Sequence, residues 1–182
     1  MSKVLVPLAN GFEEIEAITI IDVLRRAGID VVVAGLDSLE IEGANTQLKV
    51  CVTTLVDDVD VSSLDMVVLP GGLPGAEYLA KSDKIKNIIK ELNNTDRHVA
   101  AICAAPWALK EAGVLDGKKH TNYPSFESHT GKEGYISDQD VVVDGKIITS
   151  RGPATAMSFA LELVKTLEGK KTYLEVKNGL LA

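Results

Sequence analysis

The 182-residue chain has only two cysteines, Cys51 and Cys103. Two cysteines are too few for the disulfide framework of a secreted protein, so they indicate a reducing, intracellular compartment. The first residues, MSKVLVPLANGFEE, contain one lysine and a short apolar run that Pro7 interrupts, which is typical of neither a signal peptide nor a membrane span. We therefore expect a cytoplasmic protein without a membrane partner.

Positive charge is also scarce. Lys and Arg number 19 against 26 Asp and Glu, which gives a net charge of -7 and a pI near 5.0. Such a surface repels phosphate backbones, so we expect no nucleic-acid partner. The glycine-rich phosphate-binding patterns GxGxxG and GxxxxGK[ST] do not occur, and no Cys, His and carboxylate residues share the spacing of metal ligands. We expect neither a cofactor nor a metal.

The composition itself is that of a folded globular protein, with 46% hydrophobic and 25% charged residues. No repeat, low-complexity tract or linker interrupts it, so we treat residues 1–182 as one domain. Apolar runs alternate with helical patterns, which predicts an α/β protein whose mostly parallel sheet has helices on both faces. We expect strands at 3–8, 30–36, 65–69 and 98–102, helices at 13–27, 82–93, from 105 and from 153, a small β-hairpin at 140–150, and a hairpin or a pair of short strands within 39–56.

Ligands in such folds bind beyond the carboxyl ends of the strands. Cys103 follows the strand predicted at 98–102, with the small residues Ala101 and Ala105 two positions to either side, as in a nucleophile elbow. Pro106 suits the first turn of a helix, whose N-terminus would favour a thiolate. The alternative is a structural cysteine in the core, because cysteine is among the most buried residue types.

Glu16 favours the functional alternative. It shares one face of the helix predicted at 13–27 with positions 20, 23, 24 and 27, all of which are apolar. A carboxylate buried without a partner either protonates or finds one, so we predict a Glu16 carboxyl with a raised pKa that exchanges a proton with Cys103. The alternative is a partly exposed residue at a helix start. Glu13 and Glu14 lie in the first turn, where the helix dipole favours acids, and we expect them to be solvated.

The segment Pro70-Gly71-Gly72 follows the strand predicted at 65–69. Two glycines allow a sharp turn that points backbone N–H groups outward. The N–H groups of Gly72 and Ala104 would then form a pair of donors near the sulfur, like an oxyanion hole.

None of the three histidines is a convincing third catalytic group. His98 begins the strand that leads to Cys103, so it lies at the far end from the predicted elbow. His120 and His129 occur in polar segments, and we expect both at the surface.

Four segments, GFEEIEAI, VVLPGG, AAICAAP and TSRGPAT, occur in this order between residues 11 and 155. Together they resemble the ThiJ/PfpI superfamily, in its Parkinson disease protein (DJ-one) branch and with YajL-like features. The resemblance implies a flavodoxin-like three-layer sandwich, a class I glutamine amidotransferase-like domain over 1–182 and usually a homodimer. It also implies that Cys103 is the reactive cysteine of the family and that Glu16 is the glutamate hydrogen-bonded to it.

The same resemblance extends to the surroundings of the cysteine. Cys51 matches a second cysteine near the dimer interface of some members. The residues implied in substrate or oxyanion binding are Gly71, Gly72, Ala104, Tyr123, Arg151, Gly152 and Pro153.

Members of this superfamily are described as cofactor-free glyoxalases, protein deglycases and redox-dependent chaperones. Tyr123 occupies a position where several members carry histidine, which argues against a Cys–His dyad. Ala104 replaces the histidine of the protease-like branch, and the His-x-Glu of amidotransferases is absent, so we expect neither proteolysis nor glutamine hydrolysis. We expect a glyoxalase or deglycase acting on methylglyoxal-type oxoaldehydes or on glycated thiols and amines; the alternative is a redox-sensing chaperone switched by oxidation of Cys103.

Overall fold

The computed structural model describes residues 1–182 and contains a seven-stranded sheet with the order β5-β2-β1-β6-β7-β9-β8. Every neighbouring pair is parallel except β8 and β9, which form the predicted antiparallel hairpin. A separate antiparallel pair joins β3 and β4. The strands are β1 (Lys3–Leu8), β2 (Asp30–Gly35), β3 (Glu40–Glu42), β4 (Lys49–Cys51), β5 (Thr54–Leu55), β6 (Met66–Leu69), β7 (His98–Ile102), β8 (Val141–Asp144) and β9 (Ile147–Ser150).

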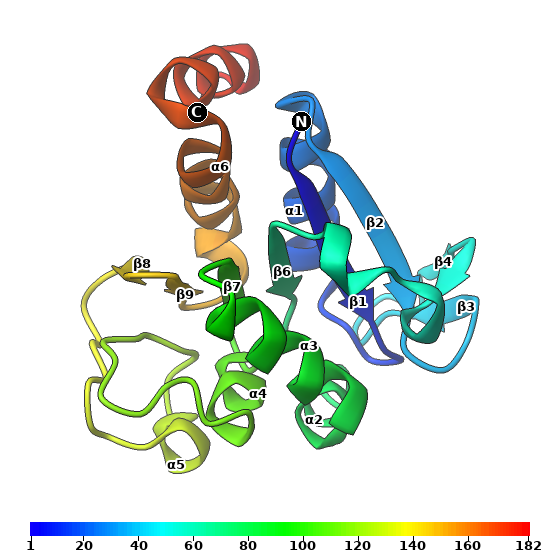
Figure 1. Ribbon diagram of the computed structural model, residues 1–182, viewed down its shortest axis with the longest axis vertical. Helices are drawn as coiled ribbons and strands as arrows, with labels where there is room; N and C mark the ends of the chain where they lie inside the picture. Colours follow the sequence, from blue (N-terminus) through cyan, green and yellow to red (C-terminus); the bar gives the residue numbers. More distant parts are fainter.

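Helices cover both faces of this sheet, which confirms the flavodoxin-like three-layer sandwich (Figure 1). One face carries α1 (Glu14–Arg26) and α6 (Ala156–Leu180), and the other carries α2 (Gly75–Lys81), α3 (Asp83–Asn94) and α4 (Pro106–Glu111). A short helix, α5 (Glu127–Thr130), packs beside α4.

Burial on both faces explains why the central strands are almost wholly apolar. In β1, Val4 and Val6 belong to the core that α1 and α6 cover, whereas Leu5 belongs to the core on the α2–α4 side. All three side chains are fully buried. A strand with two covered faces has no solvent-facing positions, so it lacks the polar alternation of a half-exposed strand.

The structure differs from the predicted elements at several places, one of which is the short helix α5, which was not predicted. Helix α2 begins at Gly75, directly after a segment that its glycines and prolines mark only as a turn. Pro153 begins a 3₁₀ turn, and α6 starts at Ala156. The segment expected to hold a hairpin or two short strands contains the β3–β4 hairpin and, in addition, β5, which joins the main sheet.

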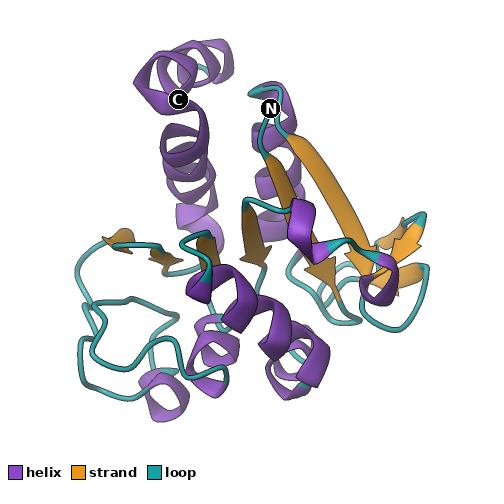
Figure 2. Ribbon diagram, in the orientation of Figure 1, coloured by secondary structure: helices purple, strands orange, loops and turns teal.

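The carboxyl ends of β1, β6 and β7 meet at one edge of the sheet, because these three strands are parallel neighbours. Both chain termini lie at the opposite end of the molecule (Figure 2). None of the helices combines the length and the apolar character needed to cross a membrane. The edge formed by these strand ends is where a ligand site is expected.

Candidate active site

Cys103 lies on a tight turn between β7 and α4, as predicted for a nucleophile elbow. Its φ of 64° is in the left-handed region that side-chain-bearing residues seldom adopt. The Cys103 N–H donates to the carbonyl of Ser150 (3.0 Å), and its own carbonyl accepts from the N–H of Tyr123 (2.9 Å). Ala101 and Ala105, the small residues on either side of the turn, are fully buried. Pro106 occupies the first turn of α4.

Glu16 is fully buried on the face of α1 that also carries Ile20 and Leu24. Its Oε2 accepts a hydrogen bond of 2.7 Å from the Gly71 N–H, while no hydrogen-bond partner satisfies Oε1. The structure thus brings the predicted carboxyl beneath the elbow, where it interacts with the Cys103 thiol.

The two glycines after β6 have different tasks. The Gly71 N–H is occupied by Glu16, so it orients the carboxyl instead of facing a substrate. A Cβ at Gly71 would lie 2.7 Å from Cys103 Cβ and 2.8 Å from Glu16 Oε2. Gly72 has a φ of 91°, and the N–H groups of Gly72 and Ala104 both lower the pKa of the Cys103 thiol. Gly72, Ala104 and Cys103 line the same cavity, and their role as a pair of donors to an oxyanion stays a prediction.

Burial governs the proton affinities of Glu16 and Cys103. It raises the pKa of Glu16 to about 7, although the hydrogen bonds from Gly71 and Cys103 act in the opposite direction. Burial also raises the pKa of the Cys103 thiol, and the negative charge of ionised Glu16 raises it further; the N–H groups of Ala104 and Gly72 lower it. The thiol predicted to be acidic is therefore not acidic while Glu16 is ionised. Protonation of Glu16 removes that charge, so the pair titrates as a unit.

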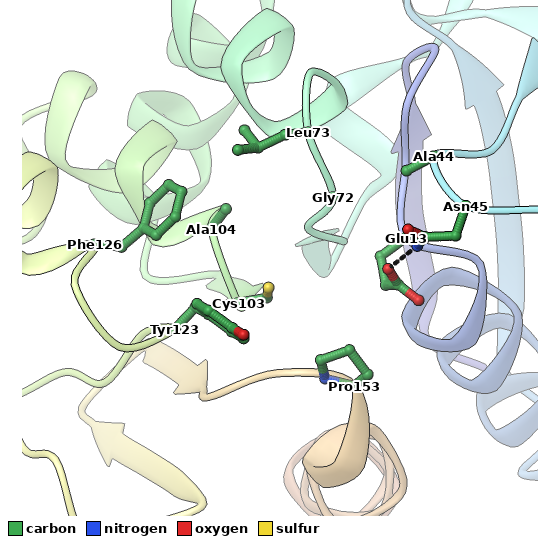
Figure 3. A pocket seen from close by; sticks show the side chains of 10 residues that line it. All are labelled: Glu13, Ala44, Asn45, Gly72, Leu73, Cys103, Ala104, Tyr123, Phe126 and Pro153. Atoms are coloured by element: carbon green, nitrogen blue, oxygen red, sulfur yellow. Dashed lines mark hydrogen bonds between the residues drawn. The ribbon is translucent and has the colours of Figure 1, made fainter.

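A cavity of about 340 Å³ opens above the Cys103 sulfur (Figure 3). Glu13 and Asn45 lie on the wall opposite Tyr123 and Phe126. The cavity is lined by Glu13, Ala44, Asn45, Gly72, Leu73, Cys103, Ala104, Tyr123, Phe126 and Pro153.

Three of the predicted binding residues do not line this cavity, and one of them is Gly71, whose N–H donates to Glu16. Arg151 and Gly152 line a neighbouring cavity of about 310 Å³, which shares Tyr123 and Pro153 with the first. Cys51 is exposed and lies in a separate groove beside α1 and β2. Arg151, Gly152 and Cys51 therefore do not line the cavity at Cys103, and a role of Arg151 and Gly152 in binding stays a prediction.

The prediction that Glu14 is solvated is wrong. Its side chain is buried, and Oε1 accepts from the N–H groups of Asn45 (3.0 Å) and Thr46 (2.7 Å) and from Thr46 Oγ1 (2.9 Å). Desolvation alone would raise the pKa of Glu14, but these hydrogen bonds outweigh it and lower the pKa to about 2. Glu14 thereby holds the segment 43–48 against the cavity. Sequence spacing could not reveal an anchor about thirty residues away.

The surface prediction for His120 is also wrong. Its side chain is fully buried, with Nδ1 3.2 Å from the carbonyl of Lys118 and no partner for Nε2. His129 is exposed, as predicted, and stacks on Trp107 with 4.1 Å between ring centroids. None of the three histidines lines the cavity at Cys103.

The fold and the site define a flavodoxin-like α/β protein with a cysteine on a strand-to-helix elbow and a buried carboxyl beneath it. Comparison with known proteins is more specific. The DJ-1/PfpI family model matches residues 2–166, and the chain belongs to this family.

Relatives show the same likeness. The chain is 43% identical over 183 residues to Protein dj-1beta of Drosophila melanogaster (100% of this chain, 98% of that protein) and 34% identical over 169 residues to "Glutathione-independent glyoxalase DJR-1.2" of Caenorhabditis elegans (93% and 88%). It is 42% identical over 181 residues to Protein DJ-1 homolog B of Arabidopsis thaliana. The match covers 98% of this chain but only 41% of that longer protein.

Solved structures agree with these sequences. The Drosophila DJ-1beta structure superposes with a TM-score of 0.95 at 42% identity and covers 100% of this chain and 99% of that one. A structure described as "Toxoplasma gondii DJ-1, oxidized" gives 0.94 at 37% identity, with 100% and 98% covered.

Replacement of Gly71 by alanine tests how tightly the elbow and the carboxyl are packed. The new Cβ would collide with both Cys103 and Glu16, so we expect Gly71→Ala to destabilise the protein by about 1–3 kcal/mol. We also expect slower alkylation of Cys103 by iodoacetamide. Urea unfolding and intact mass spectrometry measure the two effects. Gly179→Ala is the control, because nothing lies within 4 Å of a Cβ there; an equal response of both variants would contradict the packing argument.

Folding raises the pKa of Glu16 and lowers that of Glu14, so the two residues should affect the pH dependence of stability in opposite ways. Folding favours protonated Glu16, so its stabilisation is complete below the unfolded pKa of 4.5 and is lost as the pH rises through about 7. The free energy of unfolding of the native protein should therefore fall by about 2–3 kcal/mol between pH 5 and pH 8. Glu16→Gln should not show this decrease. Folding favours ionised Glu14, whose stabilisation is present above 4.5 and is lost toward pH 2.

Thermal unfolding of both variants across this pH range measures the difference. Glu14→Gln should lower Tm at pH 7, whereas Glu16→Gln should raise Tm most at pH 8. Parallel profiles of Tm against pH for the two variants and the native protein would refute the claim that folding favours protonated Glu16 and ionised Glu14.

Proposed function

We propose that the protein is a cofactor-free cysteine enzyme that converts methylglyoxal-type oxoaldehydes, or their adducts on thiols and amines, to 2-hydroxy acids. The observation that carries this proposal is the placement of Glu16 beneath Cys103 at the floor of an open cavity. The C. elegans relative named as a glutathione-independent glyoxalase supports it.

The first step forms a hemithioacetal. The Cys103 sulfur bonds to the aldehyde carbon while the C=O π bond breaks, and the thiol proton passes to the Glu16 carboxylate. The N–H groups of Gly72 and Ala104 hold the alkoxide, to which Glu16 then returns the proton. A carboxyl with a pKa of about 7 suits both directions of this transfer, because both of its forms are populated near neutral pH.

The second step moves hydrogen within the adduct. Glu16 removes the proton from the former aldehyde carbon, which gives an enediolate. The hydroxyl proton on that carbon's oxygen passes to the neighbouring oxygen, and Glu16 delivers its proton to the neighbouring carbon. The first carbon is oxidised to a thioester and the second is reduced to an alcohol, so no external oxidant or reductant takes part. Water then attacks the thioester, the sulfur leaves, and lactate is released. With an adduct on an amine, the C–S bond of the first step forms as the C–N bond breaks, and the amine leaves with the thiol proton that Glu16 has taken up.

Glu16 carries all of the proton transfer in this scheme. Tyr123 lines the cavity where several relatives have histidine, and no imidazole lines it. Catalysis with one titrating group predicts a modest rate.

Lactate formation from methylglyoxal tests the proposal. Cys103→Ala should abolish it, and Glu16→Gln should lower it by a factor of about 100 or more, because general acid–base catalysis is lost. In the native protein the rate should rise with pH through about 7, and Glu16→Gln should lack this step. Cys51→Ser is the control, since Cys51 lies outside the cavity. Equal lactate formation by Cys103→Ala and the native protein would end the proposal.

A second candidate function is redox sensing, with or without chaperone activity, through oxidation of Cys103. The oxidised Toxoplasma relative favours it. Two peroxide molecules would each transfer one oxygen to the sulfur and be reduced to water, and protonated Glu16 would donate to the resulting sulfinate. Burial of the thiol, which raises its pKa, counts against rapid oxidation.

Intact mass and peptide mapping under graded peroxide test this second function. A sensor should gain two oxygens at Cys103 before Cys51 gains any. Oxidation of exposed Cys51 alone would eliminate the sensor.

The homodimer implied by the family resemblance stays a prediction. Exposed Ile18 and Cys51 lie in a groove of about 440 Å³ beside α1 and β2, an apolar surface that a second copy could cover.

A further inference from the structure

The cavity at Cys103 has an uneven charge. Among its ten lining residues, Glu13 alone carries a formal charge, and no Lys, Arg or His contributes to the wall. None of the ion pairs of the structure involves Glu13. Arg151 lines the neighbouring cavity, together with Asp140, and does not line the cavity at Cys103. The negative charge of Glu13 is therefore not neutralised by a partner.

Glu13 is also held in place. Its backbone N–H donates to the carbonyl of Gly71 (2.8 Å), which fixes it relative to the turn beside the sulfur. Its side-chain Oε2 accepts a hydrogen bond of 2.6 Å from Asn45 Nδ2 (Figure 3). This leaves Oε1 as the free acceptor of the carboxylate.

Asn45 is fixed in turn by Glu14. The Asn45 N–H and the Thr46 N–H donate to Glu14 Oε1, and Asn45 Nδ2 lies 3.3 Å from Glu14 Oε2. Moving Asn45 away would strip a buried carboxylate of its donors, which is costly. The backbone at Gly43 also packs closely against this carboxylate, since a Cβ there would lie 2.3 Å from Glu14 Oε1. The wall that carries Glu13 is thus preorganised.

We propose that Glu13, positioned by Asn45, determines the charge selectivity of the Cys103 cavity. It favours neutral oxoaldehydes and adducts that carry a cationic or hydrogen-bond-donating group, such as carbinols formed on amino or guanidino groups. It disfavours aldehydes that carry a carboxylate or a phosphate. The apolar walls formed by Leu73, Phe126 and Pro153 screen a charge less than water does, which strengthens both effects.

This selectivity names the substrate class of the function proposed above and rests on it, but its test does not need turnover. The probes are three methanethiosulfonates, one with a trimethylammonium group, one with a sulfonate and one with a methyl group. In a Cys51→Ser background each reagent can modify only Cys103. Intact mass spectrometry gives the three rates, and the neutral reagent corrects for changes in thiol reactivity.

Glu13→Gln should lower the ratio of the cationic to the anionic rate by about three- to tenfold. Glu133→Gln is the matched control: it is exposed, it lies outside both cavities, and it changes the net charge by the same amount. Its ratio should equal that of the background protein. Leu73→Lys, which places a cation on the cavity wall, should lower the ratio as well.

An unchanged ratio in Glu13→Gln, or an equal decrease in Glu133→Gln, would overturn the proposal. Methylglyoxal turnover by the native protein is measured separately with the same preparation. Absence of turnover together with the expected change of ratio would refute the glyoxalase function and leave the charge selectivity of the cavity established.

Discussion

The molecule depends on a carboxyl group that folding removes from water. Glu16 is fully buried among the apolar residues of α1, and its only backbone donor is Gly71. Burial raises its pKa to about 7, because the ionised form loses its hydration. The Cys103 thiol lies against it on a strained turn, and the state of each group alters the proton affinity of the other.

The surrounding structure keeps this pair in a fixed geometry. Parallel β6 and β7 bring the Gly71 turn and the Cys103 elbow side by side, and α1 supplies Glu16 from the face of the sheet. Two positions earlier on α1, Glu14 has the opposite state, since donors from Asn45 and Thr46 keep it ionised. One helix thus supplies a proton-exchanging group and an anchor for the cavity wall.

Most of the sheet, the elbow at Cys103 and the burial of Glu16 could be predicted from local patterns: apolar runs, small neighbours and one acid on an apolar helix face. The predictions of burial failed for residues that are covered by segments distant in the sequence. Glu14 looks like a solvated first-turn acid until the segment 43–48 folds over it. His120 is buried because Ile136 and Tyr135 return to pair with its segment. The thiol pKa is raised mainly by burial, which the N–H groups of Ala104 and Gly72 do not outweigh.

The most direct test of this account is a ¹³C NMR titration of the Glu16 side-chain carboxyl. The account predicts a midpoint near pH 7 for the native protein, because burial disfavours the ionised form. It also predicts that Cys103→Ala shifts this midpoint upward, since the hydrogen bond to the thiol stabilises the ionised carboxyl. A midpoint near 4.5, the value of an unperturbed glutamate, would contradict the claim that Glu16 and Cys103 form a proton-sharing pair.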